Sequence, residues 1–196
     1  MKRLKHQCEI QILPDGIHWE QSPMYQNEVL NCILEVAVKF KEHQKNIPLF
    51  LKRTISKIGY SNMAMKKPNH FQPMQGDSDY TDLRDIITRC AALLEDGILK
   101  SAGYSEIDFE SIWELDKESI ENYPNIIARY PKYPSIALES SGNFFLRNSF
   151  EENGNYLWFN CGAIGSGHGH ANLLHFDLTY HGEDFFIDSG RYTYVE

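Results

Sequence analysis

Apolar side chains recur at intervals of three and four residues between about residue 22 and residue 123. This spacing predicts amphipathic α-helices, because residues three or four apart share one face of a helix. Ser22 and Pro23 suit the N-cap and the first turn of such a helix. We expect helices over roughly 22–44, 49–58 and 81–96, the last one ended by Gly97, with one or two shorter helices over 105–123 and a loop at 59–80.

The pattern changes near Pro131 to short apolar runs separated by turn residues, as in a β-meander. We expect strands at 136–138, 144–146, 156–159, 174–180 and 185–187, the last two joined as a hairpin, and then a β-prone run at 191–196. The chain is therefore predicted to be α+β, helical over 1–131 and antiparallel β over 132–196. Because a sheet of so few strands leaves unpaired edges, we expect the chain to be part of a longer protein.

Composition narrows the class of protein. Hydrophobic residues make up 42% of the 196 residues and charged residues 23%, which is typical of a packed globular chain. No apolar run reaches the ~18 to 20 residues of a membrane span, and the basic start at 1–5 is not followed by the apolar stretch of a signal peptide. A net charge of −8 argues against nucleic acid as a partner.

The four cysteines lie far apart, with no C-x-x-C pair. This excludes a zinc ribbon or a thioredoxin motif. Free buried thiols are the simplest expectation, and two disulfides stay open.

A stretch with four glycines and two histidines, 162–172, precedes the fourth expected strand. In an extended backbone, His168 and His170 would project to the same side about 7 Å apart. Asp188 follows the last strand of the hairpin, and imidazole with carboxylate suits zinc. A polar loop is the commoner explanation of such a stretch. If Tyr180 pairs with Phe185, Asp188 faces Asp177, and the loop must fold back to bring His170 near.

Two further groups could carry chemistry. Tyr25, in the first turn of its helix, could point at a cleft as an acid or base, although its spacing to Val29 and Ile33 is that of a core residue. Asp77 and Asp79 could form a paired-carboxylate hydrolase site or a calcium loop, but acidic residues ahead of a helix more simply stabilise its N-terminus.

Three blocks of sequence together resemble the heparinase II/III-like polysaccharide lyases. They are I-L-P-D-G-I-H-W-E-Q-S-P-M-Y at 12–25, D-S-D at 77–79, and G-S-G-H-G-H-A-N at 165–172 followed by D-S-G-R-Y-T-Y at 188–194. The resemblance covers nearly the whole chain. It implies the last helices of an (α/α) toroid over 1–131 and the opening strands of an antiparallel β-sandwich over 132–196.

The resemblance also implies roles for single residues. Tyr25 and His168 match the catalytic base and acid, and His170 and Asp188 match ligands of a structural zinc whose third ligand would lie beyond Glu196. The pair that neutralises the substrate carboxylate would lie before Met1. We assign Glu20, Gln21 and Asp79 to substrate binding. The chain departs from the family pattern at Gln26, where histidine is common, and at Asn172, where aspartate is frequent.

The implied activity is β-elimination on a uronate-containing acidic polysaccharide, at a periplasmic or cell-envelope location. A base removes the C5 proton and an acid protonates the departing O4, so no protein nucleophile is needed. We expect the 196-residue piece alone to be inactive. Two alternatives stay open: a non-catalytic carbohydrate- or metal-binding β-sandwich module, and a glycoside hydrolase that uses Asp77 and Asp79.

Overall fold

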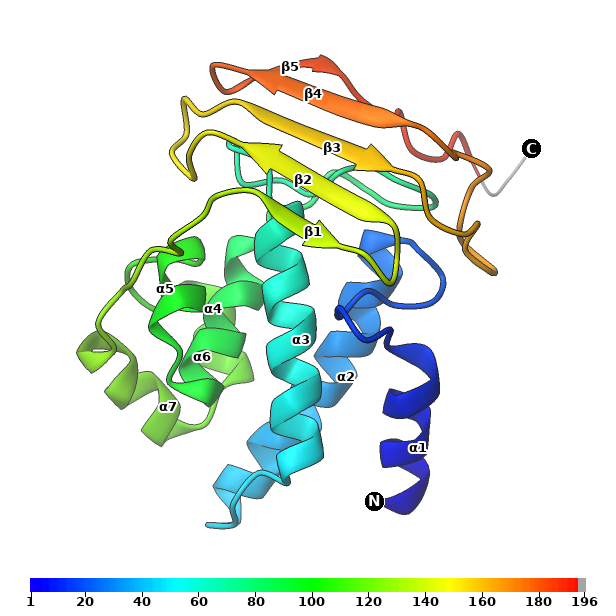
Figure 1. The fold of residues 1–196 in the computed structure, drawn as a ribbon. Helices are drawn as coiled ribbons and strands as arrows, with labels where there is room; N and C mark the ends of the chain where they lie inside the picture. Colours follow the sequence, from blue (N-terminus) through cyan, green and yellow to red (C-terminus); the bar gives the residue numbers. More distant parts are fainter. Residues whose placement is uncertain (194–196) are drawn as a thin grey trace.

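The computed structural model describes residues 1–193. Helices form one layer and a five-stranded sheet lies across one end of them (Figure 1). The helices are α1 Lys2–Gln11, α2 Pro23–Glu42, α3 Leu49–Met65, α4 Arg84–Leu94, α5 Gly97–Ala102, α6 Phe109–Glu114, α7 Lys117–Asn122 and the short 3-10 turn η1 Tyr123–Asn125. The strands are β1 Ile136–Leu138, β2 Asn143–Arg147, β3 Tyr156–Asn160, β4 Phe176–Tyr180 and β5 Glu183–Phe186.

The helical core forms where the apolar stripes of α2, α3 and α4 meet. Leu30 of α2, Leu51 and Ile55 of α3, and Ile87 of α4 are fully buried, as the three- and four-residue spacing predicts. Burying each such side chain contributes about 1.5–3 kcal/mol of hydrophobic stabilisation. These three helices form the base that supports the sheet.

Three helix predictions need correction. Helix α3 continues to Met65, seven residues into the predicted loop, because Gly59 fits closely against Leu99 and Cys90. Gly97 does not end a helix: Glu95 takes a left-handed φ of 54° that closes α4, and Asp96 accepts hydrogen bonds from the first turn of α5, which begins at Gly97. Helix α1 lies within the part expected to be helical, but its bounds were not predicted, since its residues are mostly polar and exposed.

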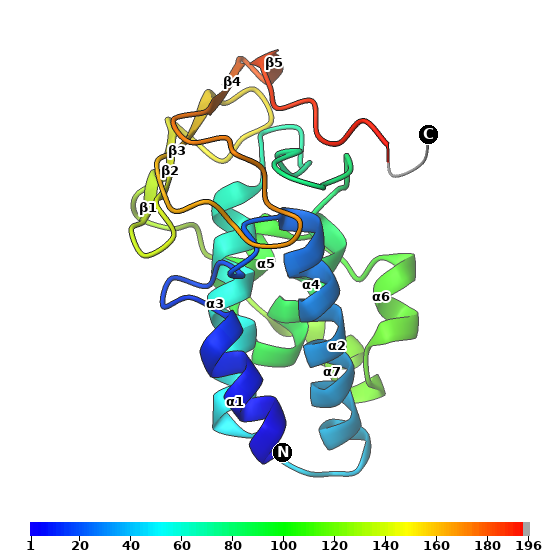
Figure 2. The ribbon, with the colours of Figure 1, turned by 90° about the vertical axis from the view of Figure 1, so that its right-hand side faces the viewer.

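The sheet is an antiparallel meander with strand order β1-β2-β3-β4-β5. Its inner face packs on the ends of the helices, as Figure 2 shows from the side, and there it buries Phe145, Tyr156 and Trp158. The predicted hairpin is confirmed, but its register is shifted. Tyr180 pairs with Glu183, and a bulge at Leu178 and Thr179 shifts the pairing along the hairpin.

The predicted α+β fold class is confirmed by this architecture. The expected division at 131/132 falls between η1 and β1, and it stays a prediction. Residues 191–193 are not in a strand, and the rest of the β-prone run expected at 191–196 lies outside the described residues. All four cysteines are free: Cys8 and Cys90 are buried, and Cys32 and Cys161 are exposed.

Within residues 1–193, no helix is both long and apolar enough to cross a membrane.

Candidate active site

The segment just before α2 meets the sheet through buried amides. The Gln21 side chain donates to the carbonyl of Ser141 and accepts from the Asn143 amide. The Asn143 oxygen in turn accepts from Trp158 and Asn160. Because Gln21 is only 6% exposed and both ends of its amide are engaged, it lies inside the contact between the helices and the sheet. Its assignment to substrate binding stays a prediction that this position does not support.

The glycine-rich stretch folds back over Glu20. A Cβ atom on Gly165 or on Gly169 would overlap the carbonyl oxygen of Glu20. Only glycine therefore permits the backbone of the loop to approach this closely. The loop is thereby seated on the residue that precedes Gln21.

This seating brings His168 to Tyr25. The two rings are stacked with their centroids 3.4 Å apart and an angle of 9° between their planes. Tyr25 is half-buried, so it is not the fully buried core residue that its spacing allowed. On its other side, His168 Nδ1 lies 2.9 Å from Glu20 Oε2. Three predicted site residues, separated by up to 148 positions along the chain, thus lie together.

The second histidine of the loop meets the acidic segment before α4. His170 Nε2 lies 3.0 Å from Asp77 Oδ1, and the Asp77 backbone N–H donates to the carbonyl of His168. Arg191 donates to Asp79 and to the carbonyl of Asp77. Asp77 thus contacts an imidazole and Asp79 a guanidinium. The hydrolase alternative that uses these two residues stays a prediction, as does the assignment of Asp79 to substrate binding.

Asp188 lies beside Asp177, although Tyr180 pairs with Glu183 and not with Phe185 as the expectation assumed. Its N–H donates to Asp177 Oδ1, and its carboxylate accepts from the Gly190 N–H. Asp177 also contacts His175, while burial raises the pKa of its carboxyl group. Among residues 1–193, no three His, Cys, Asp or Glu side chains are grouped so that they could hold a metal ion. His170 and Asp188 have donor atoms that suit zinc, but the described residues do not assemble a zinc site.

His18 and Arg191 were missed as residues of this region. His18 is 3% exposed, and neither ring nitrogen has a hydrogen-bond partner within residues 1–193. Burial lowers the pKa of His18 below its usual value, while Glu20 opposes the shift. The sequence signal was slight: His18 stands in the middle of the conspicuous block at 12–25, and Arg191 directly follows the glycine of D-S-G.

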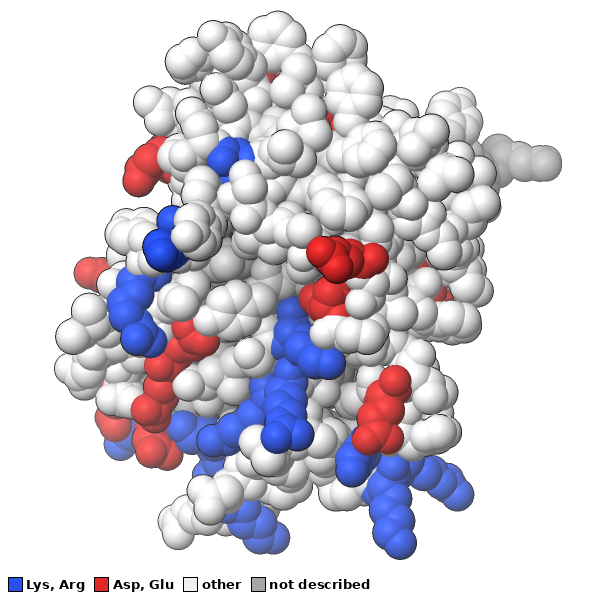
Figure 3. Space-filling model, in the orientation of Figure 1, with Lys and Arg blue, Asp and Glu red and all other residues white. Residues whose placement is uncertain are grey.

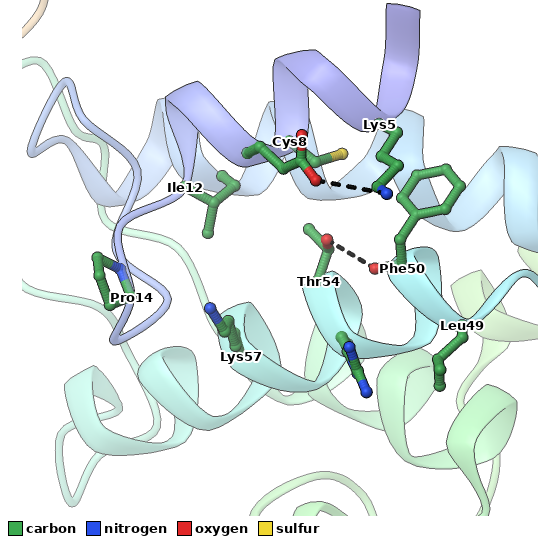
Figure 4. Close-up of a pocket in the computed structure, with 10 residues that line it drawn as sticks. Lys5, Cys8, Ile12, Pro14, Leu49, Phe50, Thr54 and Lys57 are labelled. Carbon is green, nitrogen blue, oxygen red and sulfur yellow. Dashed lines mark hydrogen bonds and ion pairs between the residues drawn. The ribbon is translucent and has the colours of Figure 1, made fainter. Parts of the chain in front are cut away.

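A separate groove of about 580 Å³ lies between α1 and α3 (Figure 4). Apolar side chains such as Ile12 and Phe50 line it, together with Lys5, Arg53 and Lys57. Basic side chains gather on the lower half of this face of the molecule, whereas few lie over the sheet (Figure 3). The groove contains none of the predicted site residues.

Comparisons with known proteins agree with the fold. The model described as heparinase II/III N-terminus matches residues 1–95, and the model described as heparinase II/III-like, C-terminal matches residues 131–196. A search of curated protein sequences found no match.

Solved structures resemble the whole chain. A heparinase III (BT4657 gene product) aligns with a TM-score of 0.80 and 19% identity over 100% of this chain and 28% of its own. The heparan sulfate lyase HepC from Pedobacter heparinus aligns with a TM-score of 0.78 and 19% identity over 100% of this chain and 29% of its own. The chain thus spans less than a third of the length of these structures. Both family models match in the order of the sequence and the fold agrees along its whole length, so the chain belongs to the heparinase II/III-like family.

Proposed function

We propose that this chain carries part of the active site of a polysaccharide lyase that cleaves a uronate-containing acidic glycan by β-elimination. The observation that carries the proposal is the contact between Tyr25 and His168. One ring comes from the first turn of α2 and the other from the loop before β4, and they stack at 3.4 Å. A base and an acid from two elements at one place can serve adjacent atoms of one sugar.

The proposed reaction uses one proton transfer at each ring. Tyr25 acts as its phenolate and His168 as its imidazolium. The phenolate oxygen accepts the C5 proton, which is acidic because it is α to the carboxylate. Electrons of the C–H bond form the C4–C5 double bond as the C4–O4 bond breaks, and Nε2 of His168 supplies a proton to O4. The cycle closes when Tyr25 loses its proton and His168 regains one from solvent. Neutralising the charge that develops on the sugar carboxylate requires donors that we do not assign within this chain.

We propose that His170 and Asp188 would be two of the ligands of a structural zinc ion, which would need at least one further ligand. His170 Nε2 now contacts Asp77, so a bound metal would take Nδ1 and leave this hydrogen bond in place, or would displace it from Nε2. Equilibrium dialysis with zinc, followed by metal analysis, tests the point on wild type, His170→Ala and Asp188→Asn. Stoichiometric zinc that both variants lose supports the site, and equal zinc in all three rejects it.

The substrate class also fits a periplasmic or cell-envelope enzyme, because large acidic glycans are met outside the cytoplasm. Because the chain spans under a third of its solved relatives, we propose that residues 1–196 alone are inactive. Fractionation of the source cells, with blotting for the protein, tests both its location and its size.

The decisive experiment is the ultraviolet absorbance of the product. The complete gene product is incubated with heparan sulfate, alginate and other uronate polymers, because elimination leaves an absorbing unsaturated uronate. Absorbance that rises together with new chain ends supports the lyase. New reducing ends without absorbance would indicate a hydrolase, and glycan binding without cleavage would indicate a non-catalytic module.

A further inference from the structure

The carboxylate of Glu20 contacts the imidazole that the proposed reaction uses. Its Oε2 lies 2.9 Å from His168 Nδ1, and the Glu20 side chain is only 19% exposed. A second constraint on the imidazole comes from Tyr25, whose ring stacks on one face of it. Together a hydrogen bond in the plane of the ring and a stacked face fix the orientation of His168.

Glu20 is itself held by the loop that carries His168. The backbone of Gly165 and of Gly169 lies against the Glu20 carbonyl oxygen. A Cβ atom on Gly167 would lie 3.2 Å from a carboxylate oxygen of Glu20. The loop thus wraps around one residue and presents its histidine to the same residue. A substitution at Glu20 or in the glycine-rich loop would therefore disturb the contact between them.

The neighbouring His18 is not an ionic partner of Glu20. Burial lowers the pKa of His18, so its imidazole is disfavoured as a cation at neutral pH. No hydrogen bond joins the His18 ring nitrogens to a partner among the described residues. The imidazole that the Glu20 carboxylate contacts is thus that of His168 and not that of His18.

We propose that Glu20 is a positioning residue that fixes the tautomer and orientation of His168, and not a substrate-binding residue. A carboxylate only accepts hydrogen bonds, so the contact requires the proton of Nδ1. Nε2 is then the nitrogen that delivers a proton to O4, and the imidazole that remains keeps its Nδ1–H on Glu20. This inference rests on the proposed lyase function, which it deepens.

The test compares Glu20→Ala and Glu20→Gln with wild type in the complete gene product. Glu28→Gln is the matched control, because Glu28 is an exposed carboxylate near the start of α2. We expect Glu20→Ala to lower kcat about 10- to 100-fold, as loss of an orienting partner does, with KM changed less than about twofold. Glu20→Gln keeps an acceptor oxygen and should recover part of kcat, and Glu28→Gln should match wild type.

A spectroscopic readout separates positioning from general damage to the fold. ¹⁵N NMR of histidine-labelled protein should show His168 protonated at Nδ1 in wild type and in Glu20→Gln. Glu20→Ala should shift it toward the other tautomer. If Glu20→Ala does not fold, Glu20→Met decides, because methionine has a similar volume but no acceptor oxygen for Nδ1–H. It should show the same loss of kcat and the same change of tautomer, and wild-type values of both would reject the proposal.

Three outcomes would overturn the proposal. The first is unchanged kcat in Glu20→Ala, and the second is an unchanged tautomer of His168 despite a lower kcat. The third is a large rise in KM with kcat retained, which would support the original assignment of Glu20 to substrate binding. A wild-type protein without lyase activity would instead reject the proposed function. The tautomer measurement would still decide the role of Glu20.

Discussion

Two sets of contacts attach the sheet to the helices, and they differ in chemistry. One is a buried network of neutral amides and an indole, formed by Gln21, Ser141, Asn143, Trp158 and Asn160, each at most 6% exposed. The other consists of ionisable pairs: Glu20 with His168, Asp77 with His170 and Asp79 with Arg191. Their side chains are between 15% and 56% exposed. Of these two sets, the neutral one is buried and the ionisable one is partly exposed.

The difference indicates a division of labour. Buried hydrogen bonds are costly to leave unpaired, so the amide network should govern stability. Partly exposed ion pairs contribute about 0–1 kcal/mol each, so substitutions in the second set should change stability little. Substitutions in the two sets should therefore have opposite signatures in stability and in activity.

The largest effect should come from Tyr25→Phe on the ionisable side. Removing the hydroxyl leaves the ring stack but takes away the proton acceptor, so kcat should fall by about 10²- to 10⁴-fold. The melting temperature should change little, because Tyr25 is only half-buried. The measurement is product absorbance beside a thermal melt. Unchanged turnover would exclude Tyr25 as the base.

On the structural side, Arg147→Met should destabilise the protein by about 2–5 kcal/mol. Arg147 is buried and donates to the carbonyls of Ala64 and Lys66 at the end of α3, and two unpaired buried carbonyls cost about 1–3 kcal/mol each. Urea denaturation measures the loss. Arg53→Met, an exposed arginine of α3, is the control and should stay within about 0.5 kcal/mol of wild type. Arg147 lies outside the amide network but is buried at the same junction of helices and sheet, so equal stability of both variants would contradict the rule that buried hydrogen bonds govern stability there.

A smaller effect should appear in the pH dependence of stability through His18. Its pKa in the folded protein lies below the unfolded value near 6.5, mainly because of burial. The unfolded chain therefore binds more protons as pH falls through about 6.5, and stability declines in that direction. Between about pH 7.5 and pH 5.5, wild type should lose up to about 1 kcal/mol more than His18→Leu. Denaturant titrations at both pH values measure it, and an identical decline in both proteins would refute it. Exposed His43→Gln should follow wild type.

The smallest perturbation is chemical labelling of thiols. Cys32 and Cys161 are exposed, whereas Cys8 and Cys90 are buried, and burial raises the pKa of Cys90 to about 12. Iodoacetamide should therefore add two groups to the native protein and four after denaturation. Intact mass spectrometry counts the groups. Rapid labelling at Cys90 would mean that the helical core opens more readily than its packing implies.

The sequence predicted the helices and strands better than the register between strands and the roles of glycines at helix ends. Periodicity located α2 to within two residues at each end, because one apolar stripe and a proline at its start determine such a helix. It did not show the bulge at Leu178 and Thr179, which has no local signature. It also misjudged Gly59 and Gly97, since glycine serves close packing as readily as it ends a helix.

The candidate site was predictable as a set of residues, but not as a geometry. The blocks of sequence named Tyr25, His168 and Glu20, yet nothing local states that Glu20 contacts His168 across 148 positions. Gln21 stands next to Glu20 and has a wholly different environment, because its left-handed φ of 57° directs the chain into the sheet contact. Such differences between neighbours arise from tertiary packing, which residue types alone do not encode.

The close seating of Gly165 and Gly169 on Glu20 has a consequence for protein engineering. Glycines in a loop are usually regarded as a source of flexibility, but here they allow close packing, because a side chain at either position would overlap the Glu20 carbonyl oxygen. Alanine at either position would lift the loop while leaving the helical core and the amide network intact. A library built there would pass a screen for thermal stability and fail a screen for turnover, so variants should be selected by activity first.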